Sequence, residues 1–329
     1  MHLLNRCLPL VLLCSCAATP QRAVDPGLPS WSDGATKASI VEFVEAVTDP
    51  RSRDFVAPEE RLAVFDNDGT LWAEQPAYFQ LLFAVDRVRA LAPEHPEWAS
   101  TQPFAAAIDG DWAALAEQGT HGLLELVTAT HAGMTSEEFD ALSAQWLAEA
   151  RHPQTQRPYT EMVYAPMLEL LEYLRAHGFR TCIVSGGGVD FLRAFAQEVY
   201  GIPPEQVVGS RLDAEYAEQD GRLVVRKRGE IAFVDDGPGK PIGIERRFGR
   251  RPILAVGNSD GDFEMLEWTT AGDGRRLALL VHHDDAEREW AYDRESSIGR
   301  LERGLDEADS RGWLVVGMRE DWKQVFAPR

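Results

Sequence analysis

Two carboxylates close together in the sequence carry the clearest chemical signal of this chain. Asp66 and Asp68 directly follow the apolar run Leu62–Phe65. Residues two apart in an extended segment project on the same side, about 6–7 Å apart along the chain. Such a pair can divide the work of a displacement reaction. One carboxylate attacks as a nucleophile, and the other donates a proton to the leaving group and later takes one from water.

Polar residues also follow two further apolar runs. Ser185 and Gly186 follow Arg180–Val184, and the free backbone N–H groups of this glycine-rich helix start predict an anion site. A third run, Ile253–Val256, is followed by a loop rich in the hard oxygen donors that suit Mg²⁺. The donors of this loop are Asn258, Asp260 and Asp262.

A lysine between the second and third loops could neutralise a phosphoryl oxygen or the nucleophile. This is Lys240, in the loop Gly237-Pro238-Gly239-Lys240-Pro241. Three other cations lie upstream and stay open as alternatives: Arg226, Lys227 and Arg228.

The elements that must position these residues alternate between apolar strands and helices. This alternation predicts an α/β fold with a doubly wound, Rossmann-like, mostly parallel sheet. In such a sheet the three loops converge at the carboxyl edge, where ligands bind. Between the first two core strands, residues 78–178 show mainly helical periodicity, which predicts an inserted all-helical cap. Residues 207–227 predict a hairpin that turns at Asp220-Gly221.

Two other patterns are weaker. Gly257-Asn258-Ser259-Asp260-Gly261 fits the nucleophile elbow of serine hydrolases, but little room follows for the acid and base, and the Asp66/Asp68 pair would be left unexplained. The run from His282 to Asp285 could bind a metal near the rim of the site, although a solvated loop is the favoured interpretation. Glu74 and Gln75 are expected at the entrance of the cap.

Composition excludes several classes of protein. The 329 residues carry a formal net charge of −20, which excludes a general nucleic-acid binder but not a small phosphorylated substrate. No run approaches the roughly 18 apolar residues that cross a bilayer. Cys182 is the only cysteine outside the first 16 residues, and its apolar neighbours predict a buried strand residue.

The N-terminal residues predict export. Residues 1–15 have the charged and apolar regions of a signal peptide. Leu13-Cys14-Ser15-Cys16 resembles the lipobox of bacterial lipoproteins, in which Cys16 would carry the lipid, with Cys14 a departure from the usual pattern. We therefore expect a periplasmic protein anchored to the outer membrane, with residues 16–35 as a tether. Plain secretion after cleavage near Ala17-Ala18 is the alternative.

Together the motifs resemble those of the haloacid dehalogenase-like (HAD) hydrolases. Phe65–Thr70 matches the first motif, Val184–Gly186 the second, Lys240 the third and Gly257–Asp262 nearly the fourth. The long insertion is similar to the helical cap of the phosphoserine-phosphatase-like branch. More narrowly, the strings FDNDGTLW, VSGGG and GNSDGD resemble exported bacterial non-specific acid phosphatases.

The resemblance implies a division into a HAD-like core, residues 36–73 and 160–329, and a helical cap, residues 74–159. It implies that Asp66 is the nucleophile and Asp68 the general acid and base. Ser185, Gly186 and Lys240 would hold the phosphoryl group. The implied cofactor is Mg²⁺, with Asp66, Asp68, Asn258 and Asp262 as its ligands. Asn258 departs from the family pattern, which has a carboxylate there, and removes one negative charge.

These observations predict a Mg²⁺-dependent phosphomonoester hydrolase that forms an aspartyl-phosphate on Asp66. A dehalogenase or a phosphomutase of the same fold is one alternative, although metal-free dehalogenases of the family lack the second aspartate. A lipoprotein that binds a ligand without catalysis is the other. The sequence predicts neither the physiological substrate nor the oligomeric state.

Overall fold

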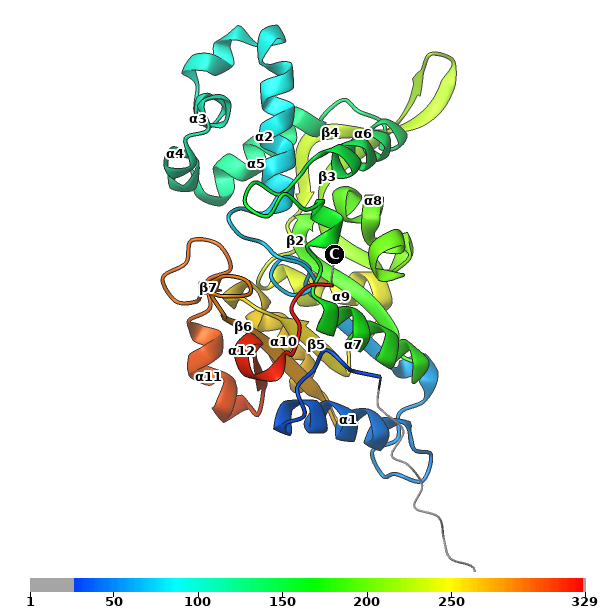
Figure 1. The fold of residues 1–329 in the computed structure, drawn as a ribbon. Coiled ribbons are helices and arrows are strands. Elements are labelled where there is room, and N and C mark those ends of the chain that lie inside the picture. The colour runs from blue at the N-terminus through cyan, green and yellow to red at the C-terminus, as the bar shows by residue number, and fades with distance from the viewer. Residues whose placement is uncertain (1–26, 328–329) are drawn as a thin grey trace, which may run out of the picture.

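The computed structural model describes residues 27–327, and a mixed sheet with helices on both faces forms its centre (Figure 1). Strand β1 (Leu62–Phe65) pairs in parallel with β2 (Arg180–Gly188) on one side and with β5 (Leu254–Gly257) on the other. The strand order is β4-β3-β2-β1-β5-β6-β7, with β8 against β6. The chain order therefore reverses at β1, so the loops after β1, β2 and β5 meet at a topological switch point. The remaining strands are β3 (Val207–Gln219), β4 (Arg222–Phe233), β6 (Leu277–Asp284), β7 (Ala291–Tyr292) and β8 (Leu314–Gly317).

Alternate residues of β1 face two different hydrophobic clusters, one on each side of the sheet. Ala63 and Phe65 pack in the cluster that includes residues of α1, α7 and α8. Leu62 and Val64 pack in the cluster that includes residues of α9, α10 and α11. Helices on both faces confirm the predicted doubly wound α/β fold. The bounds are α1 (Ala35–Thr48), α7 (Ala165–Ala176), α8 (Val189–Tyr200), α9 (Gly239–Phe248), α10 (Phe263–Thr270) and α11 (Arg303–Arg311), with the short α12 (Met318–Asp321) near the end.

A group of helices between β1 and β2 lies beyond the carboxyl edge of the sheet (Figure 1). It has a hydrophobic cluster of its own, built around residues such as Val88, Phe104 and Leu126. The hairpin of β3 and β4 leans against this group, because the backbone of Lys227 exchanges hydrogen bonds of 2.9 Å with Gly133 and Met134. The helices, all within residues 74–159, are α2 (Phe79–Leu91), α3 (Phe104–Asp109), α4 (Trp112–Glu117), α5 (Gly119–His131) and α6 (Ser136–Glu149). Below, this helical group is called the cap.

Some local predictions differ from the structure. The hairpin does turn at Asp220 (φ 50°) and Gly221 (φ 74°), as a type I′ turn requires, but its second strand continues to Phe233 rather than ending at residue 227. Residues 237–241 were expected to be a loop, whereas α9 begins at Gly239. Pro241 lies in the first turn of α9. Proline is tolerated there because the N–H groups of a first helical turn have no partner inside the helix.

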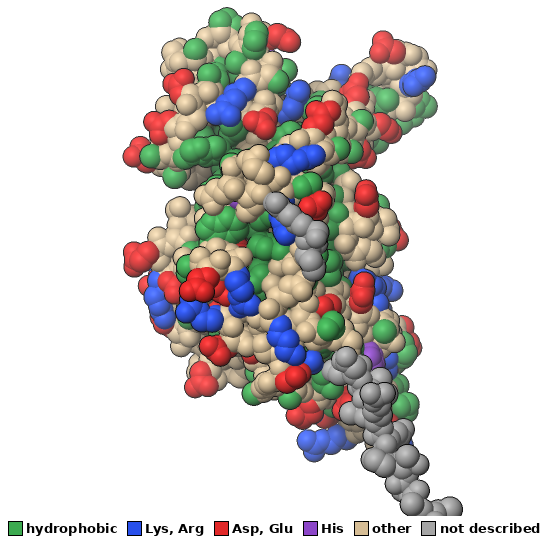
Figure 2. Space-filling view, in the orientation of Figure 1, with side chains coloured by type: hydrophobic (Ala, Val, Ile, Leu, Met, Phe, Trp, Pro, Cys, Tyr) green, Lys and Arg blue, Asp and Glu red, His purple; other side chains and the backbone are tan. Residues whose placement is uncertain are grey.

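Acidic and basic side chains are interspersed over the face shown in Figure 2. None of the helices in residues 27–327 is both long and apolar enough to cross a membrane. Cys182 is fully buried in β2, as predicted, and burial raises the pKa of its thiol to about 12. The predicted signal peptide, Cys16 and most of the tether lie outside the described residues.

Candidate active site

The loop after β1 turns sharply and brings its polar residues to the edge of the sheet. The carbonyl of Asn67 accepts the backbone N–H groups of Thr70, Leu71 and Trp72. Gly69 has a φ of +73°, and a Cβ there would lie 2.1 Å from Asn258 Nδ2. Both the conformation and the close approach of the two loops therefore require glycine at this position.

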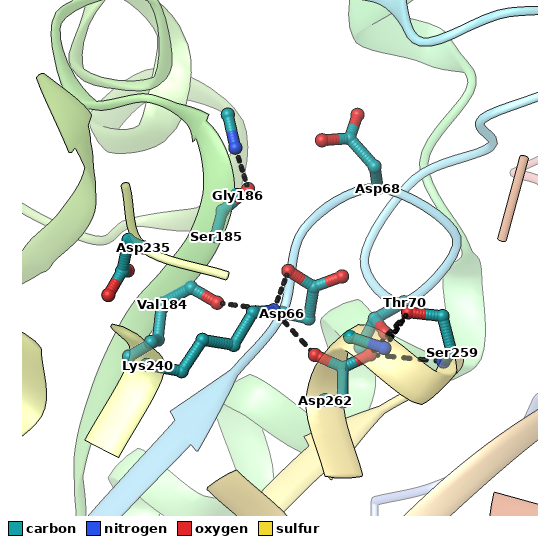
Figure 3. Close-up of polar contacts among 12 residues, drawn as sticks. Asp66, Asp68, Thr70, Val184, Ser185, Gly186, Asp235, Lys240, Ser259 and Asp262 are labelled. Atoms are coloured by element: carbon teal, nitrogen blue, oxygen red, sulfur yellow. Dashed lines mark hydrogen bonds and ion pairs between the residues drawn. The ribbon is translucent and has the colours of Figure 1, made fainter. Parts of the chain in front are cut away.

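Asp66 and Asp262 share one buried lysine (Figure 3). Lys240 Nζ donates to Asp66 Oδ1 at 2.7 Å, to Asp262 Oδ1 at 2.5 Å and to the carbonyl oxygen of Val184 at 3.2 Å. Burial raises the pKa of Asp66, the charge of Asp262 raises it further, and Lys240 opposes both effects. Burial alone would lower the pKa of Lys240, but the two carboxylates raise it above its usual value. The lysine is therefore held as a cation.

This geometry selects Lys240 from the cations left open by the sequence. Lys227 forms an ion pair with Asp190 and lies over the ring of Phe139, 4.9 Å from its centroid. The other two cations pair with carboxylates of the hairpin, Arg226 with Glu215 and Arg228 with Asp213 and Glu215. Lys240 was expected in a loop, but it lies in the first turn of α9 and is 2% exposed. The first turn of α9 carries it beneath the nucleophile loop.

Asp262 has partners other than the predicted metal. Its Oδ2 accepts the backbone N–H groups of Asn258 (2.9 Å) and Ser259 (3.0 Å) and the Ser259 hydroxyl (3.2 Å), while Oδ1 accepts Lys240. Three of these donors lie on Oδ2 and one lies on Oδ1. In this structure Asp262 therefore fixes the lysine and the turn after β5, and its role as a metal ligand stays a prediction.

Asp68 lies above Asp66 on the same loop (Figure 3). Its Oδ1 accepts the indole N–H of Trp72 at 2.7 Å, which fixes the orientation of the carboxyl group. Burial raises the pKa of Asp68, and the hydrogen bond from Trp72 and the charge of Lys240 offset only part of that effect. A raised pKa favours the protonated form that a general acid needs.

Ser185 and Gly186 lie on the other side of the site and line one cavity with Asp66. Ser185 Oγ accepts the N–H of Gly187 at 3.1 Å, and the N–H of Gly188 donates to Gln80 of α2 at 2.6 Å. These N–H groups were expected to be free. They are engaged because β2 continues through Gly188 and Gln80 reaches across from the cap. The Ser185 hydroxyl has no acceptor in the described chain, so it can donate to a ligand.

Glu74 is the main residue of the site whose position was not predicted from the sequence. It was expected near the cap entrance, but it is 2% exposed and contacts Asn258. Asn258 Nδ2 and the Tyr292 hydroxyl each donate to Glu74 Oε1 at 2.8 Å, and Thr70 donates to Asn258 Oδ1 at 2.9 Å. A carboxylate therefore stands directly behind the amide that replaces the expected aspartate.

His283 is also part of the site's framework. The interpretation of residues 282–285 as a solvated loop is wrong for this residue, which is 1% exposed. Its Nε2 donates to the carbonyl oxygen of Gly69 at 2.8 Å, and its Nδ1 contacts Glu289 Oε2 at 3.1 Å. Glu289 also accepts the Tyr164 hydroxyl at 2.8 Å. This chain of contacts supports the turn that carries Asp66 and Asp68.

The remaining loop residues have structural partners. Asp260 accepts the backbone N–H groups of Glu302, Arg303 and Gly304, and so caps α11 rather than facing the site. The Ser259 hydroxyl accepts the N–H of Gly261 and donates to Asp262. These contacts fit a turn-capping role and give Ser259 no base to activate it as a nucleophile.

The donor set of this edge fits Mg²⁺. No group of three or more His, Cys, Asp or Glu side chains within residues 27–327 forms a ready metal cage. Mg²⁺, however, is usually held by one or two carboxylates together with water and substrate phosphate. The carboxylate of Asp66, Asn258 Oδ1 and the main-chain oxygen of Asp68 supply hard oxygen donors of that kind. The nearby carboxyl groups outnumber the buried cation Lys240, and burial raises the pKa of Asp66 and of Glu74. An added positive charge would therefore favour their ionised forms.

Comparisons with known proteins identify the family of this chain. The model of one protein family, described as haloacid dehalogenase-like hydrolase, matches residues 63–267. None of the curated proteins matches the chain. Among solved structures, a functionally unknown protein from Anaerococcus prevotii is similar with a TM-score of 0.56 and 16% identity, covering 89% of this chain and 94% of its own.

Two further solved structures are similar at low identity. A protein of unknown function from Bordetella pertussis has a TM-score of 0.50 and 18% identity, covering 78% of this chain and 98% of its own. A phosphoserine phosphohydrolase-like protein from Francisella tularensis has a TM-score of 0.39 and 16% identity, covering 76% and 98%.

Proposed function

Because this chain belongs to the haloacid dehalogenase-like hydrolases, we propose that it is a Mg²⁺-dependent phosphomonoester hydrolase in which Asp66 becomes phosphorylated. The observation that carries the proposal is the shared lysine. Lys240 holds Asp66 by Oδ1, while Oδ2 has no hydrogen-bond partner in the described part of the chain. One oxygen of the carboxylate is thus fixed, and the other is free to attack.

The residues divide the proposed reaction into two displacements. Asp66 Oδ2 attacks the phosphorus atom, the bond from phosphorus to the ester oxygen breaks, and Asp68 gives its proton to the departing alcohol. Asp68, now ionised, takes a proton from water, and the resulting hydroxide displaces the Asp66 carboxylate from phosphorus. The products are the alcohol and inorganic phosphate, and both carboxyl groups return to their first state.

Ser185 and Lys240 support the transferred group. The Ser185 hydroxyl and the ammonium group of Lys240 would each donate to a phosphoryl oxygen, which stabilises charge that builds up during transfer. The other oxygen of the Asp66 carboxylate, the main-chain oxygen of Asp68 and Asn258 Oδ1 would hold Mg²⁺, with the carboxyl group of Glu74 behind Asn258. The bound ion would reduce the repulsion between the carboxylate of Asp66 and the phosphate dianion.

The experiment is phosphate release from 4-nitrophenyl phosphate at millimolar Mg²⁺. Asp66→Asn and EDTA should each abolish release, because the first removes the nucleophile and the second the ion. Asp309→Asn, which changes an exposed carboxylate on α11, is the matched control and should keep full activity. Release that survives both Asp66→Asn and EDTA would refute the proposal, and a protein that binds phosphate esters without hydrolysing them would support the non-catalytic alternative.

We further propose that the protein is exported and carries a lipid on Cys16. The support is the leader pattern of residues 1–15 and the Leu-Cys-Ser-Cys sequence that ends at Cys16. Radiolabelled palmitate should be incorporated by the full chain expressed in a bacterium and not by its Cys16→Ala variant. Equal labelling of both chains, or of neither, would contradict the lipid anchor.

A further inference from the structure

The cavity of the candidate site extends away from the two aspartates into the cap. It has a volume of about 220 Å³. Asp66, Asp68, Ser185 and Lys240 form its polar end. The rest of its wall is mostly apolar and comes from the cap, α8 and the hairpin. The main apolar side chains are Leu81, Leu123, Leu124, Val127, Phe139 and Phe191.

Several of these side chains leave apolar surface open to the cavity. Leu81, Leu123, Leu124 and Val127 are only half-buried. On the hairpin side, Ile231 is 41% exposed and lines the same cavity. Concave apolar surface beside a few convergent polar groups is typical of a ligand pocket.

The charged side chains that line this part of the cavity come from α8, the hairpin and the residues directly after it, and none comes from α5: they are Asp190, Arg211, Lys227 and Asp236. Lys227 is paired with Asp190, which also lies near Arg193. Arg211 lies over the ring of Phe233, 5.6 Å from its centroid. A charged or strongly polar leaving group that lies against the wall formed by α5 would therefore lose water there and find no charged side chain of α5 in exchange.

One polar atom on the cap wall does lack a partner. The Thr130 hydroxyl donates to the carbonyl oxygen of Leu126 at 2.7 Å, so its contact of 2.7 Å with His131 Nδ1 requires that Nδ1 carry the hydrogen. Burial, together with Lys227 and Arg87, lowers the pKa of His131 to about 3, so the ring is neutral. His131 Nε2 is then a bare acceptor, and it is buried without a hydrogen-bond partner among the described residues.

We propose that the substrate is a phosphomonoester of an uncharged, apolar alcohol, with an aromatic or bulky aliphatic body that lies against α5. A hydroxyl or N–H group on that body would donate to His131 Nε2. This inference rests on the proposed phosphatase function and narrows it to a class of leaving group.

A matched pair of substrates tests the apolar wall. 2-Phenylethyl phosphate and O-phosphoserine both release a primary alcohol, so their ester bonds are of similar reactivity. Because burial of a phenyl ring in an apolar pocket is favourable, we expect kcat/KM for 2-phenylethyl phosphate to be at least about 10-fold higher. Equal or better turnover of phosphoserine would overturn the inference and leave the phosphatase function intact. If neither ester nor 4-nitrophenyl phosphate released phosphate, the proposed function itself would fail.

A variant in the wall locates the effect. Leu124→Asn should raise KM for 2-phenylethyl phosphate about 10-fold and change kcat/KM for methyl phosphate by less than about twofold, because methyl phosphate does not reach the wall. Leu223→Asn, at a position 67% exposed on the hairpin, is the matched control and should change neither value. Equal losses for both esters in Leu124→Asn would contradict a leaving-group pocket at α5.

The acceptor at His131 has its own test. The 3- and 4-hydroxyphenyl derivatives of 2-phenylethyl phosphate each add one donor to the same body. At least one should have a KM several-fold lower than the parent ester with the wild-type protein, and His131→Leu should remove that advantage. A wild-type protein that does not distinguish the three esters, or an advantage that persists in His131→Leu, would overturn this part of the inference.

Discussion

Exchanging the amide and the carboxylate between positions 258 and 74 gives the sharpest test of how charge is arranged in the site. Asn258 Nδ2 donates to Glu74 Oε1 at 2.8 Å. Asn258→Asp would place a second carboxylate at the same distance, in a position where Glu74 is 2% exposed. Two unit charges 2.8 Å apart repel by about 6 kcal/mol at an effective dielectric constant of about 20.

This repulsion is an upper limit, because the pair can take up a proton or move apart. We expect Asn258→Asp to lower the free energy of unfolding by about 3 kcal/mol at pH 8 without Mg²⁺. The double variant Glu74→Gln/Asn258→Asp restores one amide and one carboxylate with the donor on the other side. It should recover most of the loss, giving a coupling free energy of at least about 2 kcal/mol.

Urea unfolding of the wild-type protein, the two single variants and the double variant, followed by tryptophan fluorescence and circular dichroism, measures this coupling. Thr70→Val alters the other hydrogen bond of Asn258 without adding charge and serves as the control. The predicted repulsion between the two carboxylates would be refuted if Asn258→Asp were as stable as the wild type, or if the double variant were no more stable than Asn258→Asp.

Three other changes test the framework. Lys240→Met leaves Asp66 and Asp262 buried without their shared cation, so unfolding free energy should fall by about 3–5 kcal/mol in urea titrations, and Lys240→Met/Asp66→Asn should recover part of it. Asp235 is fully buried, neither carboxylate oxygen has a hydrogen-bond partner among the described residues, and burial raises its pKa to about 7. Because the pKa of Asp235 is higher in the folded than in the unfolded protein, ionisation of its carboxyl group costs stability as pH rises from about 4 to 7. Thermal scans should therefore show the stability of Asp235→Asn relative to the wild type growing over that pH range. A difference that stays constant with pH would contradict the raised pKa. His283→Phe removes the donor to the Gly69 carbonyl and should lower unfolding free energy by about 2–4 kcal/mol, whereas His282→Ala, at the neighbouring position, should have a much smaller effect.

The strands and the nucleophile loop could be predicted because their signals are local. Leu62–Phe65 is an apolar run bounded by the polar loop that begins at Asp66, and β1 has those bounds in the structure. The Asp220-Gly221 turn was likewise found from two residues with special backbone preferences. Where a few neighbouring residues determine the conformation, the sequence is sufficient.

Lys240 shows a limit of local signals. Glycine and proline around it indicate a loop, but packing of α9 against the sheet overrides that preference and buries the lysine. Asp262, in contrast, has a local signal. A serine followed three residues later by an acidic residue is similar to a capping box, in which the acidic side chain accepts the N–H of the serine, and Ser259 and Asp262 form such a box.

The sequence singled out the positions of Glu74 and His283, but no local signal predicted the contacts that they make. Glu74 is 184 residues from Asn258 in the sequence, and His283 is 214 residues from Gly69. Contacts of this kind depend on how the loops after β1, β5 and β6 meet at the sheet edge. A single sequence gives the loops that carry chemistry, but it does not show which side chains from other loops support them.

The three partners of Lys240 differ in what the proposed reaction does to them. The reaction does not alter the carbonyl oxygen of Val184 or the carboxylate of Asp262. Asp262 is itself fixed by three donors from the turn after β5. Asp66 alone changes, because phosphorylation converts its carboxylate into an acyl phosphate and moves the negative charge onto the phosphoryl oxygens. Lys240 can then follow that charge with a small movement of its ammonium group while Asp262 keeps it in place. A lysine shared between one constant and one changing carboxylate is thus suited to both displacements, with Asp262 as the anchor of the lysine.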